Sequence, residues 1–141
     1  MTAYTRMPAM ARNYDPGFQP TRPQEFMYAI LTGSYFQCRT GLTALAGGGR
    51  PTTDGAQQLD YGYNEVAVVA TSADSVLLPP AVAGAFVFVD NIGAASMTVF
   101  AIGSDTINTT AGATGVAQSN GVNGLYFCPI VGKWRKISAS T

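Results

Sequence analysis

The chain has 141 residues and no net charge, and only 11% of its residues are charged against 47% hydrophobic. Its length fits one domain with its own core, and its composition excludes wholesale disorder, because disordered chains carry many charges and few aromatics. A surface with so few charges favours association with identical neighbours, because a lone monomer of this kind would tend to aggregate.

The few charges are unevenly placed along the chain. Residues 1–50 hold five arginines and two carboxylates, residues 51–132 hold six carboxylates and no basic residue, and Lys133, Arg135 and Lys136 follow. This pattern predicts a basic segment held against an acidic partner, or against the acidic body of a neighbouring copy. Ordinary scatter of so few charges is the alternative.

Residues 1–25 hold four of the eight prolines together with arginines and aromatics. Proline at this density prevents a long helix or a central strand, and Tyr, Phe and Arg are typical of binding hot spots. We therefore expect an extended arm that binds a partner or a neighbouring copy; a frayed terminus is the alternative. The expected contact residues are Tyr4, Arg6, Arg12, Tyr14, Phe18, Arg22 and, further along, Arg39.

Residues 26–45 contain two apolar runs that are too short for periodicity to separate a helix from a buried strand. The Gly-rich stretch 47–51 breaks the pattern, and it lacks the GxxxxGK[ST] spacing of a phosphate-binding loop. The predicted organisation is an arm and connecting segment over 1–45, a Gly-rich loop and lead-in over 46–64, and a β domain over 65–141.

From residue 64 onward, β-branched and apolar runs alternate with turn residues. Strands that recur about every ten residues, with no amphipathic helix between them, indicate a mainly β fold of the sandwich or barrel type. The expected strands are Val66–Thr71, Ser75–Leu78, 85–89, Met97–Ile102, Val122–Cys128 and Lys133–Ile137.

The expected strand over 85–89 is apolar on both faces, although a strand of a sandwich normally has one polar face. Burial on both sides predicts an interface between subunits. The expected interface residues are Phe86, Val87, Phe88 and Val89.

Residues 103–118, GSDTINTTAGATGVAQ, carry one charge and many small residues. Within a run of strands, this composition indicates two short β segments, around 106–108 and 115–118, joined by an Ala-Gly-Ala turn. We therefore interpret the segment as part of the β fold and not as a binding loop.

The residues that carry out most chemistry are missing. The chain has no histidine, which excludes Ser-His and Cys-His nucleophile pairs, and its carboxylates lie in turn-like sequence. Cys38 and Cys128 form no metal or redox pattern; we expect two buried thiols in a reducing compartment, with a disulfide left open. We predict no enzyme activity, no cofactor, no metal site and no small-molecule substrate.

Nucleic-acid and membrane partners are also disfavoured. The arginines and aromatics of the arm match a nucleic-acid binder only weakly, and Trp134 is expected to close the core, facing away from its basic neighbours. The first ten residues lack an apolar run typical of a signal peptide, and no segment is long enough to span a bilayer. We expect synthesis in a host cytoplasm, without secretion.

The segment over 66–134 has an ordered set of motifs: S-V-x-L-P at 75–79, AVAG at 81–84, N-x-G-A at 91–94, T-V-F at 98–100, GSDTIN at 103–108 and GKW at 132–134. This order resembles a module found in virion proteins of tailed bacteriophages, among them capsid cement or decoration proteins. The resemblance covers about half the chain, and residues 1–45 lie outside it. It implies a jelly-roll-like β-sandwich in an oligomer over joints between major capsid subunits.

We therefore expect a structural protein on the outer surface of a phage capsid, whose partners are the major capsid protein and its own copies. A homotrimer is the first expectation and a dimer stays open. The alternative is a receptor- or glycan-binding module of a head fibre or tail, which would use exposed aromatics. Its candidates are Tyr61, Tyr63 and Tyr126.

Overall fold

The computed structural model describes residues 37–46 and 52–138. The chain divides into two units, Met1–Gln37 and Cys38–Thr141, and the strands found among the described residues lie in the second. The described residues form strands and contain no helix. The strands are β1 (Cys38–Thr43), β2 (Gln57–Gln58), β3 (Gly62–Val68), β4 (Ser75–Leu77), β5 (Phe86–Asn91), β6 (Met97–Phe100), β7 (Thr106–Ile107), β8 (Thr110–Ala111), β9 (Val116–Gln118), β10 (Val122–Ile130) and β11 (Lys133–Ser138).

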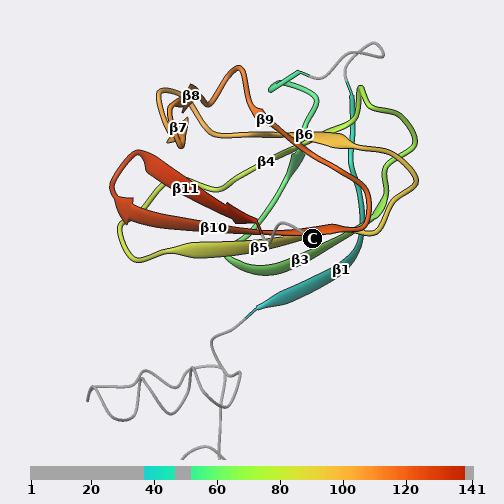
Figure 1. Cartoon of the computed structure of the whole chain (residues 1–141), viewed down its shortest axis with the longest axis horizontal. Coiled ribbons are helices and arrows are strands. Elements are labelled where there is room, and N and C mark those ends of the chain that lie inside the picture. Colours follow the sequence, from blue (N-terminus) through green and yellow to red (C-terminus); the bar gives the residue numbers. More distant parts are fainter. Residues whose placement is uncertain (1–36, 47–51, 139–141) are drawn as a thin grey trace, which may run out of the picture. The chain divides into compact units, whose positions relative to one another are not determined.

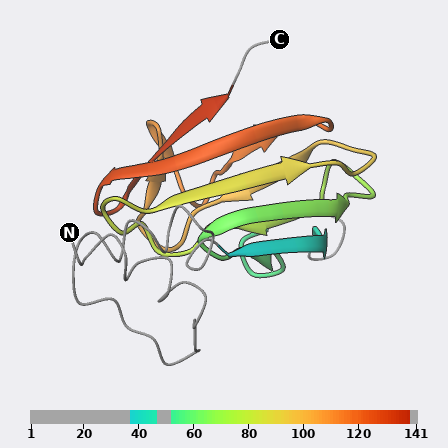
Figure 2. The same ribbon diagram turned by 90° about the horizontal axis from the view of Figure 1, so that it is seen from below.

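The strands build two sheets that lie one over the other (Figure 1). The larger sheet has seven strands in the order β1-β3-β5-β10-β11-β7-β8, and the smaller has four in the order β2-β4-β6-β9. Figure 2 shows the larger sheet from below, with β1, β3, β5 and β10 side by side. Both sheets are mixed, because each contains parallel and antiparallel pairs.

The first six strands coil, because the chain moves from one sheet to the other and back. β1, β3 and β5 pair in parallel in the larger sheet, while β2, β4 and β6 pair in parallel in the smaller. Each strand of one sheet is thus the connection between two parallel strands of the other. The result is a β-solenoid of about four turns.

Antiparallel strands complete the far side of the coil. β10 pairs antiparallel with β5 and with β11, and β9 pairs antiparallel with β6. The loop before β10 turns at Gly121, whose φ of 71° lies in the left-handed region that favours glycine. Antiparallel pairing at β5/β10 and at β6/β9 therefore extends both sheets beyond the parallel coil.

Apolar side chains from both sheets fill the space between them. Trp134 of β11 and Tyr126 of β10 are fully buried, with 0% exposure. They pack with aliphatic residues that alternate along the strands and so face inward. The buried aliphatic set includes Leu59, Val66, Val76, Leu78, Val87, Val89, Met97, Val99 and Ile107.

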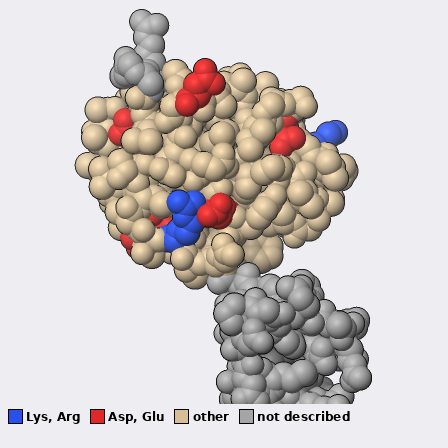
Figure 3. Space-filling model, turned by 180° about the vertical axis from the view of Figure 1, so that it is seen from behind, with Lys and Arg blue, Asp and Glu red and all other residues tan. Residues whose placement is uncertain are grey.

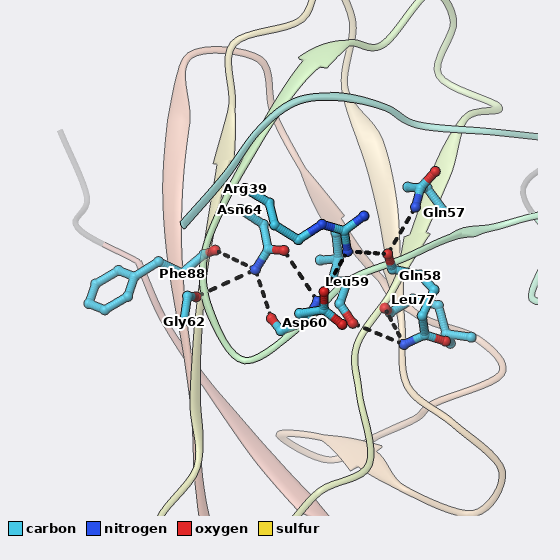
Figure 4. A network of polar contacts seen from close by, with 9 residues as sticks. All are labelled: Arg39, Gln57, Gln58, Leu59, Asp60, Gly62, Asn64, Leu77 and Phe88. Atoms are coloured by element: carbon cyan, nitrogen blue, oxygen red, sulfur yellow. Dashed lines mark hydrogen bonds and ion pairs between the residues drawn. The ribbon is translucent and has the colours of Figure 1, made fainter. Parts of the chain in front are cut away.

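Buried amides hold the turns of the coil. Asn64 of β3 donates from Nδ2 to the carbonyl oxygens of Asp60 (2.8 Å), Gly62 and Phe88 (Figure 4), and its Oδ1 accepts from the Asp60 N–H. Gln118 of β9 donates from Nε2 to the carbonyl oxygens of Val89 (2.7 Å) and Val122 (2.9 Å). Both amides thus hydrogen-bond to backbone groups, because a buried amide without partners would be costly.

The prediction of a mainly β fold is confirmed, but the jelly-roll-like arrangement is wrong. Jelly rolls are built from antiparallel strands joined as Greek keys, whereas β1, β3 and β5 are parallel neighbours. Parallel strands are usually connected by a helix. Here the connection is a strand of the second sheet, so parallel pairing arises without any helix in the described part of the chain.

The expected strands from residue 64 onward are all present, within a few residues at each end. The segment 103–118 forms β7 and β9 as expected, and it also forms β8, which pairs antiparallel with β7. This interpretation of the small-residue stretch as part of the fold is confirmed. β1, by contrast, lies in the predicted connecting segment 1–45 and β2 in the predicted lead-in 46–64, yet both belong to sheets.

Candidate interaction surface

Four neighbouring strands of the seven-stranded sheet, β3, β5, β10 and β11, present one face to the outside of the fold. We call this the outer face. Alternation along each strand places its side chains opposite the residues that face the core. Its members are Tyr63, Glu65, Phe86, Phe88, Asp90, Asn123, Leu125, Phe127, Lys133, Arg135 and Ile137.

Strand register arranges most of these residues in three rows that cross the strands. The central row is Tyr63, Phe88, Leu125 and Ile137. The row on one side of it is Phe86, Phe127 and Arg135. The row on the other side is Glu65, Asp90 and Asn123. The centre of the outer face is therefore apolar, and Glu65, Asp90 and Arg135 lie in the two rows that flank it.

The apolar part of the outer face is substantially open to solvent. Phe127 is 38% exposed and Ile137 is 58% exposed, and Phe86 and Phe88 are each 36% exposed. The rings of Phe86 and Phe88 meet edge to face, with centroids 6.0 Å apart. Covering apolar surface contributes about 25 cal/mol per Å², so a partner that covers this face gains binding energy from it.

The structure separates the four residues that the sequence assigned to an interface. Val87 and Val89 are buried in the core of their own chain, with 0% and 1% exposure. They cannot contact another subunit directly, because the smaller sheet already covers them. Phe86 and Phe88 lie on the opposite, outer face, and their contact with a neighbouring copy stays a prediction.

One end of the outer face is acidic. Asp90 of β5 and Glu65 of β3 are cross-strand partners. The Tyr63 hydroxyl donates to Asp90 Oδ2 at 2.8 Å, and the backbone N–H of Gly41 donates to Glu65 Oε1 at 3.2 Å. This hydrogen bond to Asp90 raises the pKa of Tyr63 to about 12, since ionising the phenol would break the bond and place two negative charges together. Neither carboxylate has a cation within ion-pair distance in the described part of the chain.

The opposite end of the outer face is basic. Lys133 and Arg135 alternate with buried Trp134 along β11, so both point outward. Arg135 lies directly across from Phe127 of β10. Neither side chain forms an ion pair with another described residue.

Figure 3, which shows another side of the molecule, has few charges on the described part.

Arg39, expected to contact a partner, is bonded within its own chain. From β1, the edge strand of the sheet, its guanidinium donates to Asp60 Oδ2 at 3.0 Å and to the Gln58 carbonyl at 3.2 Å (Figure 4). The arginine thus ties β1 to the loop between β2 and β3. Because both charged groups remain accessible to water, the pair adds at most about 1 kcal/mol to stability.

Six of the predicted contact residues lie outside the described residues: Tyr4, Arg6, Arg12, Tyr14, Phe18 and Arg22. Among the aromatics proposed for sugar binding, Tyr126 is buried and donates from its hydroxyl to Gln118 Oε1, which removes it as a stacking platform. Burial raises its pKa well above the usual value. Tyr61 remains exposed, and its hydroxyl donates to the Pro80 carbonyl.

The cysteines differ from expectation in one respect. Cys128 is buried, as predicted, but Cys38 is exposed on the edge strand, and both are free thiols. Trp134 closes the core, as predicted. The described residues contain no group of three or more side chains suited to hold a metal ion. They also contain no helix long and apolar enough to cross a membrane.

The sequence analysis missed several members of the outer face. Leu125 and Phe127 lie between buried neighbours on β10, and Ile137, three residues after buried Trp134 on β11, faces the side opposite to that tryptophan. The signal was available, because alternation that places Tyr126 and Cys128 inside must place Leu125 and Phe127 outside. These residues join Phe88 only through strand pairing, and that pairing could not be read from any single segment.

Comparison with known proteins adds no further assignment: no family model, no curated protein and no solved structure matches this chain.

Proposed function

We propose that this protein is a structural component of a phage virion, a capsid cement protein that binds over joints between major capsid subunits on the outer surface of the shell. The observation that carries the proposal is the outer face, an apolar centre with charged ends on a two-layer β fold. The sequence resemblance to virion proteins over 66–134 supports the same conclusion. No enzymatic activity, cofactor or small-molecule substrate is part of the proposal.

A cement protein needs a rigid body and accessible binding surface. The buried amide of Asn64 and the buried Tyr126–Gln118 pair provide rigidity, because they fix the connections between the sheets. The outer face provides apolar surface at its centre, where Leu125 and Ile137 lie. Such a protein stabilises a shell by adding interface area at joints that are stretched by packed DNA, and many weak contacts repeated over a shell act together.

The arm residues predicted from sequence remain part of the proposal. Arg6, Arg12 and Arg22, with the tyrosines and phenylalanine between them, combine the residue types that dominate binding hot spots. We expect them to lie across capsid subunits. Arg39 also stays a predicted contact residue, although its guanidinium is already paired with Asp60 in its own chain.

The test is co-sedimentation of the purified full chain with undecorated shells of the same phage's major capsid protein. The proposal predicts saturable binding with a fixed number of copies per shell, and shells that resist heating to a higher temperature. Replacing Arg6, Arg12 and Arg22 together by Glu should weaken binding at least tenfold. A variant with Asp54, an exposed loop residue, replaced by Asn serves as a control for a surface substitution outside the arm.

If the full chain does not bind, the cement function is wrong, and the fibre or tail module becomes the leading hypothesis. If it binds but the triple arginine variant binds equally well, the β domain is the binding element and the arm hypothesis is wrong.

A further inference from the structure

The charges of the outer face occupy two opposite corners. Glu65 and Asp90 lie at one end of β3 and β5, and Arg135 lies towards the other end of β11. From Asp90 to the row of Arg135 is about 14 Å along the strands, and from the β3/β5 side to β11 is about 12 Å across them. The line that joins the acidic and basic corners therefore runs diagonally across the face, with the apolar central row between them.

A face of this kind is complementary to itself. A two-fold axis in the plane between two copies, at about 45° to the strands, exchanges the corners, so that each basic corner lies over the acidic corner of the other copy. The strands of the two sheets then cross at about 90°, one of the two angles at which sheets pack. The same rotation makes the two central rows cross at right angles, so that they meet around Leu125, with Ile137 of each copy over the region of Asn123 of the other.

We propose that the outer face binds the outer face of a second copy of this chain, with Arg135 of each copy paired to Glu65 and Asp90 of the other. The proposal goes beyond the proposed function, because it concerns the free protein and does not depend on capsid binding. It gives a definite geometry to the contact between copies that the sequence predicted, with Leu125 where the two central rows cross. It also selects a two-fold pair over a trimer.

The size of the face sets the strength of the pairing. Four strands span about 19 Å, and six residues along them span about 20 Å. Two copies packed face to face then bury on the order of 1,000 Å² in total, at the low end of specific interfaces. We expect a reversible dimer whose population depends on protein concentration. Its dissociation constant should rise with salt, because the charged corners lie at the rim of the contact.

Charge reversal on the full-length chain tests the pairing. Arg135→Glu places acid over acid, and Glu65→Arg places base over base, so each variant alone should dissociate at least tenfold more readily than the wild type in sedimentation velocity. In an equal mixture of the two variants, the two substituted positions face each other at one contact, where the charges are exchanged but remain opposite. The untouched Glu65 and Arg135 meet at the second contact. Because Asp90 keeps its negative charge opposite the substituted position 135, the mixture should dimerise more readily than either variant alone but less readily than the wild type.

The matched control uses Asp54→Arg, which gives the same net charge as Glu65→Arg but lies in an exposed loop outside the outer face. Mixed with Arg135→Glu, it should not restore pairing, so general attraction between oppositely charged chains is distinguished from contact at the corners. Circular dichroism of each variant establishes that it is folded. As a second probe, Ile137→Asp in the central row should abolish the dimer at any salt concentration.

Three results would overturn the proposal: a wild-type chain that stays monomeric at several hundred micromolar, single charge reversals without effect on association, or a complementary mixture that does not pair. Each is independent of shell binding, which is measured separately by co-sedimentation. Failure of the pairing is thus distinguishable from failure of the cement function.

Discussion

Three tyrosine hydroxyls donate hydrogen bonds of the same length in three different environments. Replacing each tyrosine by Phe should show how burial changes the contribution of such a hydrogen bond to stability. The hydroxyls of Tyr126, Tyr63 and Tyr61 each donate to an oxygen at 2.8 Å. Tyr126 and its acceptor Gln118 are buried, with 0% and 1% exposure. Around the hydroxyls of Tyr63 and Tyr61, by contrast, water can replace a hydrogen bond that is lost on substitution.

The expected magnitudes follow from what each substitution leaves behind. Tyr126→Phe leaves Gln118 Oε1 without its donor in a place that water does not reach, which should cost about 1–3 kcal/mol of unfolding free energy. Tyr63→Phe and Tyr61→Phe leave acceptors near water and should cost less than about 1 kcal/mol each. Urea unfolding with an unchanged m-value measures the difference. In thermal scans, each kcal/mol corresponds to about 3–5 °C for a domain of this size.

A double-mutant cycle identifies the cause. Gln118→Leu removes the acceptor of Tyr126 and also the donor to the carbonyl oxygens of Val89 and Val122, so it is costly alone. Adding Tyr126→Phe should then cost little more, which gives a coupling energy of about 1 kcal/mol or more. Equal costs for Tyr126→Phe and Tyr63→Phe, or strict additivity in the cycle, would refute the argument from burial.

Three further predictions address the surface, the backbone and the sheet edge. Asp90→Asn should lower the pKa of Tyr63 from about 12 towards 10 in an ultraviolet titration; because the folded pKa lies above the unfolded one, the stabilisation from this residue is complete below about pH 10 and is lost as pH rises towards 12. Gly93→Ala would place a Cβ 2.5 Å from a backbone nitrogen and should cost about 2 kcal/mol or more. Gly41→Ala, with open space but φ +70°, should cost only about 1–2 kcal/mol; urea unfolding compares the two. Arg39→Ala should lower stability by at most about 1 kcal/mol, and less in high salt, because its ion pair is exposed; urea unfolding at low and high salt tests both parts.

The positions of most strands could be predicted from the sequence, because β-branched runs between turn residues indicate strands whatever their partners. Val76 of β4 and Val99 of β6 lie in such runs, and both are buried as expected. β1 gave no such signal, because its sequence CRTGLT has a single large apolar residue. It is an edge strand, with a neighbour on one side only, so it needs less apolar surface than a central strand.

Strand direction could not be predicted. A strand has the same alternation of side chains whether its neighbour runs parallel or antiparallel, so the pattern of β5 says nothing about β3 or β10. The usual evidence for parallel pairing is a helical connection, and the described part of this chain uses strands of the second sheet instead. The evidence lay in spacing: Cys38, Tyr63 and Phe88 are evenly spaced along the sequence and are successive neighbours across the sheet.

That spacing also explains why β5 is apolar on both faces. The inward residues Val87 and Val89 belong to the core that every turn of the coil must fill, whereas Phe88 extends a row that begins in the preceding turns and continues through Leu125 and Ile137. One face of the strand is fixed by folding, and the other carries the surface that the coil exposes. Substitutions on the two faces of the sheet should therefore change different properties. Loss of the Val87 side chain on the inner face should lower stability, and loss of the Ile137 side chain on the outer face should weaken association. The apolar residues of β5 that suggested an interface thus belong to two sets: Val87 and Val89 lie in the core, and Phe86 and Phe88 lie on the outer face. Only strand pairing distinguishes the two sets.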